Sequence, residues 1–130
     1  MISNGSGHIV NIGSIAGKEV YEKGNVYCAT KFAVDALSKG MRIDMVKHNI
    51  KVTCISPGMV ETEFSMVRFK GDSARAAKVY EGVTPLYAED IAQAILFAVT
   101  RPPHVNIDEI LIMPTAQAGA TIVNRKVTGK

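Results

Sequence analysis

Short β-branched runs alternate with longer segments of helical periodicity along this chain. Residues 8–12 and 50–55 are such runs, and each ends in a turn signal, Gly13 after the first and Ser56-Pro57-Gly58 after the second. Residues 25–48 contain no proline and place apolar side chains three and four positions apart, which predicts one long amphipathic helix. This order favours an α/β fold, because parallel strands need crossover connections that are usually helical.

The alternation continues in the second half of the chain. Acidic side chains open an apolar-periodic stretch over residues 88–99, which predicts a second helix, and residues 109–113 predict a third strand. Residues 59–84 have no clean period and predict a lid with one short helix near 74–80, whereas 115–130 are expected to form a loosely held tail. Because ligands of parallel sheets bind at the carboxyl ends of strands, chemistry is expected at Gly13-Ser14, Pro57-Gly58 and Pro114-Thr115.

The composition indicates a packed domain and excludes several other classes of protein. The 130 residues are 47% hydrophobic and 21% charged, unlike a disordered tail, a collagen-like repeat or a disulfide scaffold. A net charge of +3 is too small to indicate nucleic acid or an anionic membrane as a partner. No apolar run reaches the roughly 20 residues of a membrane span, and residues 1–7 lack a signal-peptide pattern. A cytoplasmic location is therefore expected.

The cysteines and histidines give no sign of a metal site. Cys28 and Cys54 lie in apolar surroundings without a CxxC spacing, which is typical of reduced core thiols in a reducing compartment. His8, His48 and His104 are scattered and lack the spacing of metal ligands. No metal cofactor is therefore predicted.

Tyr27 and Lys31 open the long predicted helix and share one face of it, because they are four positions apart. A lysine ammonium near a tyrosine favours the phenolate, which can exchange protons with a reacting hydroxyl group. Ser14 supplies a hydroxyl that reaches the same reacting oxygen if the chain between the first strand and the helix folds back. Taken separately, each feature also fits a common structural role, an exposed helical pair for Tyr27 and Lys31 and a turn cap for Ser14.

Together these residues resemble the short-chain dehydrogenase/reductase family. In that family a serine ends one strand, Tyr-x-x-x-Lys opens the next helix and Pro-Gly ends the next strand. The same order occurs here, as Asn11-Ile12-Gly13-Ser14, Tyr27-Cys28-Ala29-Thr30-Lys31 and Ser56-Pro57-Gly58-Met59-Val60-Glu61-Thr62. The resemblance covers roughly residues 7–115. It implies that 1–130 is the carboxyl-terminal half of one NAD(P)-binding domain, the second half of a doubly wound parallel Rossmann-type sheet with three strands and crossover helices.

The resemblance also implies a role for each residue of the pattern. Tyr27 is expected to act as general acid or base on the substrate hydroxyl, and Ser14 to hold and polarise its oxygen. Lys31 is expected to favour the tyrosinate and, with Tyr27, to contact the nicotinamide end of the cofactor. The loop residues expected to line that end are Pro57, Gly58, Val60 and Thr62.

A narrower resemblance concerns the substrate. Residues 62–65, 67–72 and 104–107 are similar to the branch of the family that oxidises 3-hydroxy acids such as serine and allo-threonine with NADP. Arg68 is then expected to bind the substrate carboxylate, although the alternative is an ordinary solvated lid residue. NAD stays possible, because the residues that discriminate the two cofactors lie in the other half of such a domain.

That other half, which carries the glycine-rich turn for the pyrophosphate, has no counterpart in this sequence. Three interpretations remain open. The chain is part of a longer dehydrogenase, or a non-catalytic fragment that acts as an oligomerisation module through its long helix, or a small enzyme that assembles its site across chains. Family members are commonly homodimers or homotetramers, so self-association is expected alongside a small-molecule substrate. The length, adequate for a small domain, is about half of what this chemistry needs.

Overall fold

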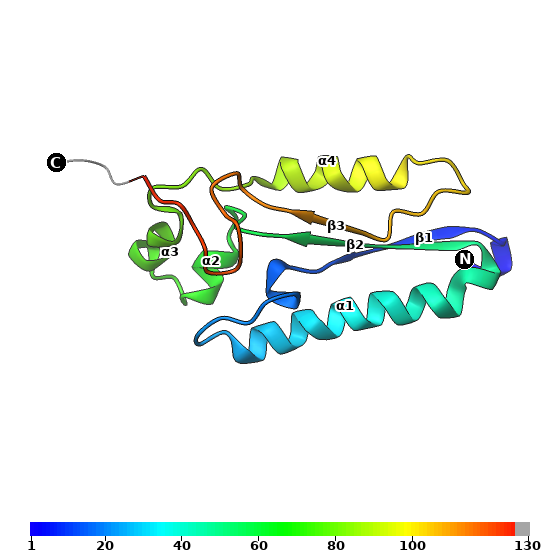
Figure 1. Ribbon diagram of the computed structural model, residues 1–130, viewed down its shortest axis with the longest axis horizontal. Coiled ribbons are helices and arrows are strands. Elements are labelled where there is room, and N and C mark those ends of the chain that lie inside the picture. Colours follow the sequence, from blue (N-terminus) through cyan, green and yellow to red (C-terminus); the bar gives the residue numbers. More distant parts are fainter. Residues whose placement is uncertain (127–130) are drawn as a thin grey trace.

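The computed structural model describes residues 1–126 and shows two layers of helix around a small parallel sheet (Figure 1). The sheet has three strands, β1 (Gly7–Ile12), β2 (Ile50–Pro57) and β3 (Glu109–Ile112), in the order β1-β2-β3. Both pairings are parallel, with His8 opposite Lys51 in the first and Pro57 opposite Ile112 in the second. The predicted α/β fold with three parallel strands is confirmed.

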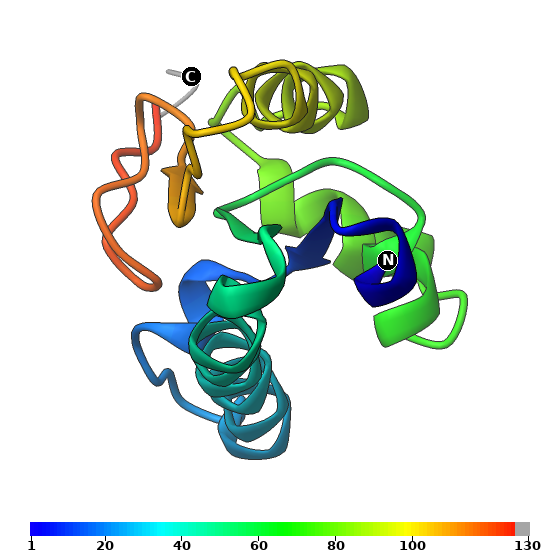
Figure 2. The same cartoon turned by 90° about the vertical axis from the view of Figure 1, so that its right-hand side faces the viewer.

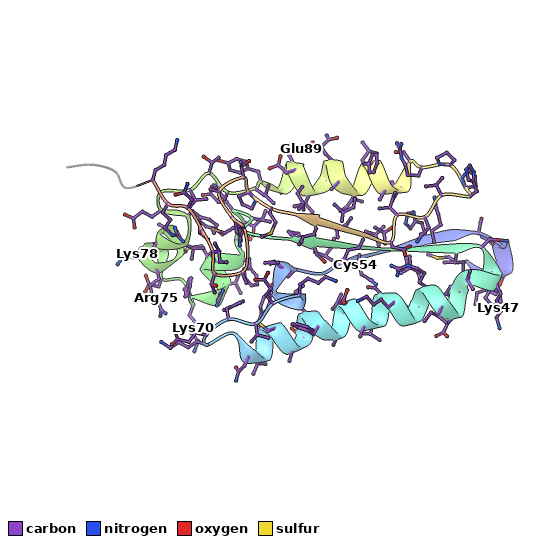
Figure 3. The ribbon with its side chains drawn as sticks, viewed as in Figure 1. Lys47, Cys54, Lys70, Arg75, Lys78 and Glu89 are labelled. Atoms are coloured by element: carbon purple, nitrogen blue, oxygen red, sulfur yellow. The ribbon has the colours of Figure 1, made fainter. Side chains whose placement is uncertain are left out.

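The central strand β2 forms the core of the molecule. Val52, Thr53 and Ile55 have no solvent-exposed surface, and the hydroxyl of Thr53 is satisfied by donating to the carbonyl of Ile107 at 2.6 Å. The thiols of Cys28 and Cys54 are both free and buried, as the sequence predicts. In Figure 3, Cys54 lies between the helical layers. Nearly complete burial of β2 on both faces explains its unbroken apolar and β-branched sequence.

Two helices cover opposite faces of the sheet (Figures 1 and 2). Helix α1 (Asn25–Met45) connects β1 to β2, and α4 (Ala88–Val99) precedes β3. At the start of α4, the Asp90 carboxylate accepts from the Tyr87 amide at 2.7 Å, so the acidic side chain predicted for this turn caps it. The long helix becomes a 3-10 turn, η3 (Val46–His48), before Asn49 reverses the chain with φ 54°.

Residues 59–84, predicted to form a lid and here called the lid, contain two short helices rather than one. Helix α3 (Ser73–Tyr80) matches the predicted segment, and the Asp72 carboxylate accepts from the Arg75 amide to cap it. Helix α2 (Phe64–Arg68) was not predicted, because five residues are too few to show a period. In Figure 3 the side chains of Lys70, Arg75 and Lys78 lie on the lid, at the opposite end of the molecule from Lys47.

The segment after β3 differs from the loosely held tail expected from the sequence. Gln117 and Val123 form an antiparallel bridge, and the Lys126 amide donates to the carbonyl of Gly82 at 2.9 Å. Residues 114–126, here called the C-terminal segment, therefore fold against the lid, while 127–130 lie outside the described residues. The remaining short elements are η1 (Ile2–Asn4) and η2 (Ile15–Gly17). Among the described residues, no helix combines the length and apolarity needed to cross a membrane.

Candidate active site

An open cavity of about 630 Å³ lies where the carboxyl ends of β1 and β2 meet the lid. Its walls come from the loop after β1, the start of α1, the loop after β2, the lid and the C-terminal segment. The residues that were given a role from the sequence all contribute to its lining: Ser14, Tyr27, Lys31, Pro57, Gly58, Val60, Thr62 and Arg68. The fold therefore brings these residues to one place, at the edge of the sheet where ligands are expected. Pro114 and Thr115, the third place where chemistry is expected from the sequence, do not line the cavity.

The connection between β1 and α1 folds back because Gly17 packs directly against α1. A Cβ atom at Gly17 would lie only 2.7 Å from the carbonyl oxygen of Lys31, closer than a real Cβ can approach. Helix η2 therefore lies on the turn of α1 that carries Lys31. Ser14, which begins η2, reaches the cavity together with Tyr27 in this way.

The hydrogen bonds of Ser14 and Lys31 leave donors available for a ligand. Ser14 Oγ accepts from the Ala16 amide at 3.1 Å, so the serine also caps η2, as the structural alternative predicted. Lys31 Nζ donates to the carbonyl of Ile12 at 3.1 Å and lies 5.8 Å from the centre of the Tyr27 ring. A hydroxyl can donate while it accepts, and an ammonium has three donors, so both groups keep hydrogen atoms for a second partner.

The lid contacts the tyrosine directly. The rings of Tyr27 and Phe64 have centres 5.6 Å apart and are tilted by 44°, a geometry favourable for aromatic pairs. Behind this contact, Tyr80 Oη donates to the carbonyl of Val60 at 2.9 Å and lies 2.7 Å from Ser65 Oγ. Because the single Tyr80 proton goes to Val60, the Ser65 hydroxyl is the donor to Tyr80. Tyr80 thus joins α2 and α3 to the loop after β2.

Arg68 lies in the lid near two aromatic rings. Its guanidinium is 5.7 Å from the centre of the Tyr21 ring and 5.6 Å from that of Phe69. Burial raises the pKa of the Tyr21 phenol, and the positive charge of Arg68 opposes this shift. Within the described part of the chain, no carboxylate forms an ion pair with Arg68. The cation therefore faces the cavity without a counter-charge.

The sequence interpretation missed several residues that line this cavity. Tyr21 belongs to the irregular chain before α1, where no spacing marks it. Tyr80 was assigned to a short helix without a role, and Gln117 and Arg125 fell in the expected tail. No local pattern marks Gln117, because Met59, its hydrogen-bond partner, is 58 positions away in the sequence.

Comparison with known proteins identifies the family. The sequence pattern of the family described as short chain dehydrogenase matches residues 1–73, which include Ser14, Tyr27 and Lys31. The chain belongs to this family. The resemblance seen in the sequence is thereby confirmed, and the three-stranded sheet is part of the family's Rossmann-type fold.

The relatives of this short-chain dehydrogenase chain are about twice as long. An NADP-dependent 3-hydroxy acid dehydrogenase of Schizosaccharomyces pombe is 47% identical over 124 residues, covering 95% of this chain and 48% of the relative. An uncharacterized oxidoreductase of Mycobacterium tuberculosis is 50% identical over 121 residues, covering 93% and 48%. The solved closed form of a serine dehydrogenase complexed with NADP+ superposes with a TM-score of 0.90 at 44% identity, covering 97% and 52%. The chain thus spans about half the length of these relatives.

The residues of the cavity fit the nicotinamide end of a dinucleotide and not its whole length. Lys31 and Ser14 keep free donors, and Thr62 Oγ1, which accepts from the Phe64 amide at 3.3 Å, keeps its own proton. These are donors suited to ribose hydroxyls, a carboxamide or a phosphate. The sequence contains no glycine-rich turn between a strand and a helix that could hold the pyrophosphate.

Proposed function

We propose that this chain is the catalytic half of an NADP-dependent dehydrogenase that oxidises the hydroxyl carbon of a small 3-hydroxy acid of the serine or allo-threonine type. The observation that carries the proposal is one cavity lined both by Ser14, Tyr27 and Lys31 and by Arg68, which has no carboxylate partner among the described residues. The first group matches proton transfer to and from an alcohol, and the second matches a carboxylate. The names of the S. pombe relative and of the solved serine dehydrogenase support the same substrate class.

In this proposal Tyr27 is the general base. The Ser14 hydroxyl donates to the substrate oxygen and holds it beside the tyrosine, and Tyr27 as phenolate takes the hydroxyl proton. Lys31 Nζ lies 5.8 Å from the Tyr27 ring centre and places a positive charge beside it. When bound, NADP+ supplies the acceptor for the hydride that leaves the hydroxyl carbon. Lys31 and Tyr27, with Pro57, Gly58, Val60 and Thr62, are proposed to hold the nicotinamide end.

Arg68 is proposed to bind the substrate carboxylate. An arginine offers a planar fork of donors that matches a carboxylate, and a bound carboxylate would give this guanidinium the counter-charge it lacks. The Tyr21 and Phe69 rings, 5.7 and 5.6 Å from the guanidinium, add cation–π attraction that favours this position. The distance between the hydroxyl and the carboxylate of the substrate then decides which acids fit between Tyr27 and Arg68.

The test is an NADP+ reduction assay with L-serine, L-allo-threonine and 3-hydroxypropionate. It uses the chain of 130 residues and the same chain preceded by the part of the S. pombe relative that it does not match, here called the extended chain. We expect reduction by the extended chain, faster with NADP+ than with NAD+, and none by the 130 residues alone. Absence of turnover in the extended chain with all three acids would refute the proposal.

A second candidate, a non-catalytic oligomerisation module, is supported by the outer surface of α1. Val26, Leu37 and Ile43 expose 74%, 61% and 74% of their surface there. An apolar helix surface of this kind is typical of an interface between subunits. We propose a homodimer or homotetramer formed through α1, in the cytoplasm, where the free thiols stay reduced. Chromatography with light scattering measures the oligomeric state, and calorimetric titration measures NADP+ binding. An oligomer that binds no NADP+, both as the 130-residue chain and as the extended chain, would favour the oligomerisation module over the dehydrogenase.

A further inference from the structure

Gln117 is a buried amide at the junction of the cavity's walls, and only 7% of its surface is exposed. Its side chain uses both of its functional atoms. Oε1 accepts from the amide of Met59 at 2.8 Å, and Nε2 donates to the carbonyl of Gly119 at 3.0 Å. A buried side chain that satisfies two backbone groups at once is expensive to replace, because substitution leaves both groups unpaired.

The backbone that Gln117 holds is the loop after β2. A Cβ atom on Gly58 would collide with Gln117 Oε1 and lie 2.6 Å from Met113 Sδ, so any larger residue at this position would displace those two side chains. The same loop is tied on its other side, since the Leu86 amide donates to the carbonyl of Met59 at 2.9 Å. Gln117 therefore accepts the hydrogen bond that fixes the backbone N–H group of Met59.

The C-terminal segment that carries Gln117 is itself anchored at both ends of the cavity. The Ala120 amide donates to the Glu19 carboxylate at 2.7 Å, which joins the segment to the loop before α1. The Arg125 guanidinium donates to the carbonyls of Glu81 at 2.6 Å and Val79 at 3.1 Å, at the end of α3. These hydrogen bonds fix the position of the segment that carries Gln117.

We propose that Gln117 is a positioning residue, which sets the Gly58–Met59 backbone at the distance from Ser14 and Tyr27 that the nicotinamide end needs. It acts through the loop and not by contact with the reacting atoms. The part of this inference that concerns the nicotinamide rests on the proposed function. The part that concerns the loop rests on the hydrogen bonds of the chain alone.

The test is amide hydrogen exchange of the 130-residue chain with Gln117→Met, which keeps the volume and removes both hydrogen bonds. We expect the Met59 amide to exchange at least about tenfold faster, while the β2 amides of Val52, Thr53 and Cys54 stay within about threefold. Gln117→Glu keeps an acceptor for Met59 and is expected to restore its protection. Gln93→Met, at an exposed glutamine of α4, is the matched control. If Gln117→Met does not fold, Gln117→Asn, whose amide cannot reach Met59, takes its place.

An unchanged Met59 amide, or equal acceleration throughout β2, would overturn the positioning role. In the extended chain, Gln117→Met is expected to raise the Kd for NADP+ about tenfold, as loss of the loop position predicts. An unchanged Kd beside a fast Met59 amide would overturn the link to the nicotinamide. If the unsubstituted extended chain binds no NADP+, the proposed function fails, while the exchange result still decides the role of Gln117 in the loop.

Discussion

The two walls of the cavity are held in different ways. The inner wall, formed by the ends of β1 and β2, η2 and the start of α1, is fixed by backbone hydrogen bonds of the sheet. Gly13 N donates to the carbonyl of Ile55, and Gly58 N to that of Ile112, both at 2.7 Å. The outer wall, formed by residues 59–84 and 114–126, is fixed mainly by side chains that bind distant backbone, such as Tyr80 on Val60.

If the proposed roles hold, this difference separates the groups of proton transfer from the residue of substrate recognition. Ser14, Tyr27 and Lys31, the proposed proton-transfer groups, all belong to the inner wall, where regular structure keeps their geometry. Arg68, the proposed carboxylate ligand, belongs to the outer wall, where a few side-chain hydrogen bonds can break without unfolding the sheet. A change in the inner wall should therefore affect the rate of chemistry, and one in the outer wall should affect binding.

The largest expected effect is that of Tyr27→Phe in the extended chain. The substitution keeps the ring that contacts Phe64 and removes the only atom proposed to take the substrate proton. We expect kcat to fall by about 10²–10⁴, the usual contribution of a general base, with the melting temperature unchanged. Tyr87→Phe, at an exposed tyrosine before α4, is the control and should keep full activity. Steady-state rates with NADP+ measure both, and a kcat within about threefold of the unsubstituted protein would remove Tyr27 from this role.

A smaller effect, and one confined to binding, is expected for Arg68→Ala. Loss of a charge-assisted pair with the substrate carboxylate should raise KM for L-serine about 10- to 100-fold. Turnover of an uncharged alcohol should be unaffected, because Tyr27 and Ser14 stay in place. Arg75→Ala is the matched control, since Arg75 also contacts Phe69, 4.8 Å from its ring centre, and does not line the cavity. An unchanged KM for the acid would show that Arg68 does not bind the carboxylate and is an ordinary solvated residue.

Tyr80→Phe tests whether the outer wall can open while the sheet stays folded. It removes the hydrogen bond to Val60 and leaves the Ser65 hydroxyl without its acceptor, at a cost of about 1–2 kcal/mol. Because both bonds belong to the outer wall, hydrogen exchange should accelerate in α2 and α3, while β2 stays protected. Faster exchange throughout the sheet would show instead that the two walls unfold as one unit.

The sequence predicted more of the inner wall than of the outer wall, where it indicated Val60, Thr62, Arg68 and helix α3 but not the contacts that hold them. Strand and helix periods are local, so the positions of Ser14, Tyr27 and Pro57 followed from the order of elements and the family motif. The two segments that close the cavity are held by pairs such as Met59 and Gln117, or Glu81 and Arg125, which are far apart in sequence and carry no period. The C-terminal segment was therefore mistaken for a tail.

The sequence also gives no sign of the close approach of η2 to α1. Gly17 reads as one more loop glycine, and only the structure shows a Cβ there colliding with the backbone of Lys31. The family motif implies that Ser14 folds back toward Tyr27, but the residue types between them carry no sign of it. Long-range contacts of small residues leave no signal in a single sequence.

The smallest expected effect concerns pH and the sheet, at the amino end of β1 away from the cavity. His8 on β1 has Nε2 2.7 Å from Thr53 Oγ1, and since Thr53 donates its proton to Ile107, the histidine must donate to Thr53. Burial and, to a lesser degree, the neighbouring charge of Lys51 lower the pKa of His8 below 6.5. The buried Nδ1 has no partner among the described residues, so protonation there adds an uncompensated charge.

A lowered pKa in the folded state means that the unfolded chain binds the proton more readily. The stabilising contribution of neutral His8 is therefore complete above about pH 6.5 and is lost as the pH falls from there through the folded pKa. Urea unfolding of the 130-residue chain between about pH 7.5 and pH 5, at intervals of about 0.5 unit, measures this loss.

His8→Gln keeps a donor for Thr53 without a titrating group and should flatten the profile of unfolding free energy against pH. His104→Gln, at an exposed site, should leave that profile unchanged. Because His8 lies in β1, exchange of the lid amides should not follow the same pH dependence if the sheet and the lid unfold independently. A parallel pH response in α2 and α3 would show that the sheet and the lid lose stability together.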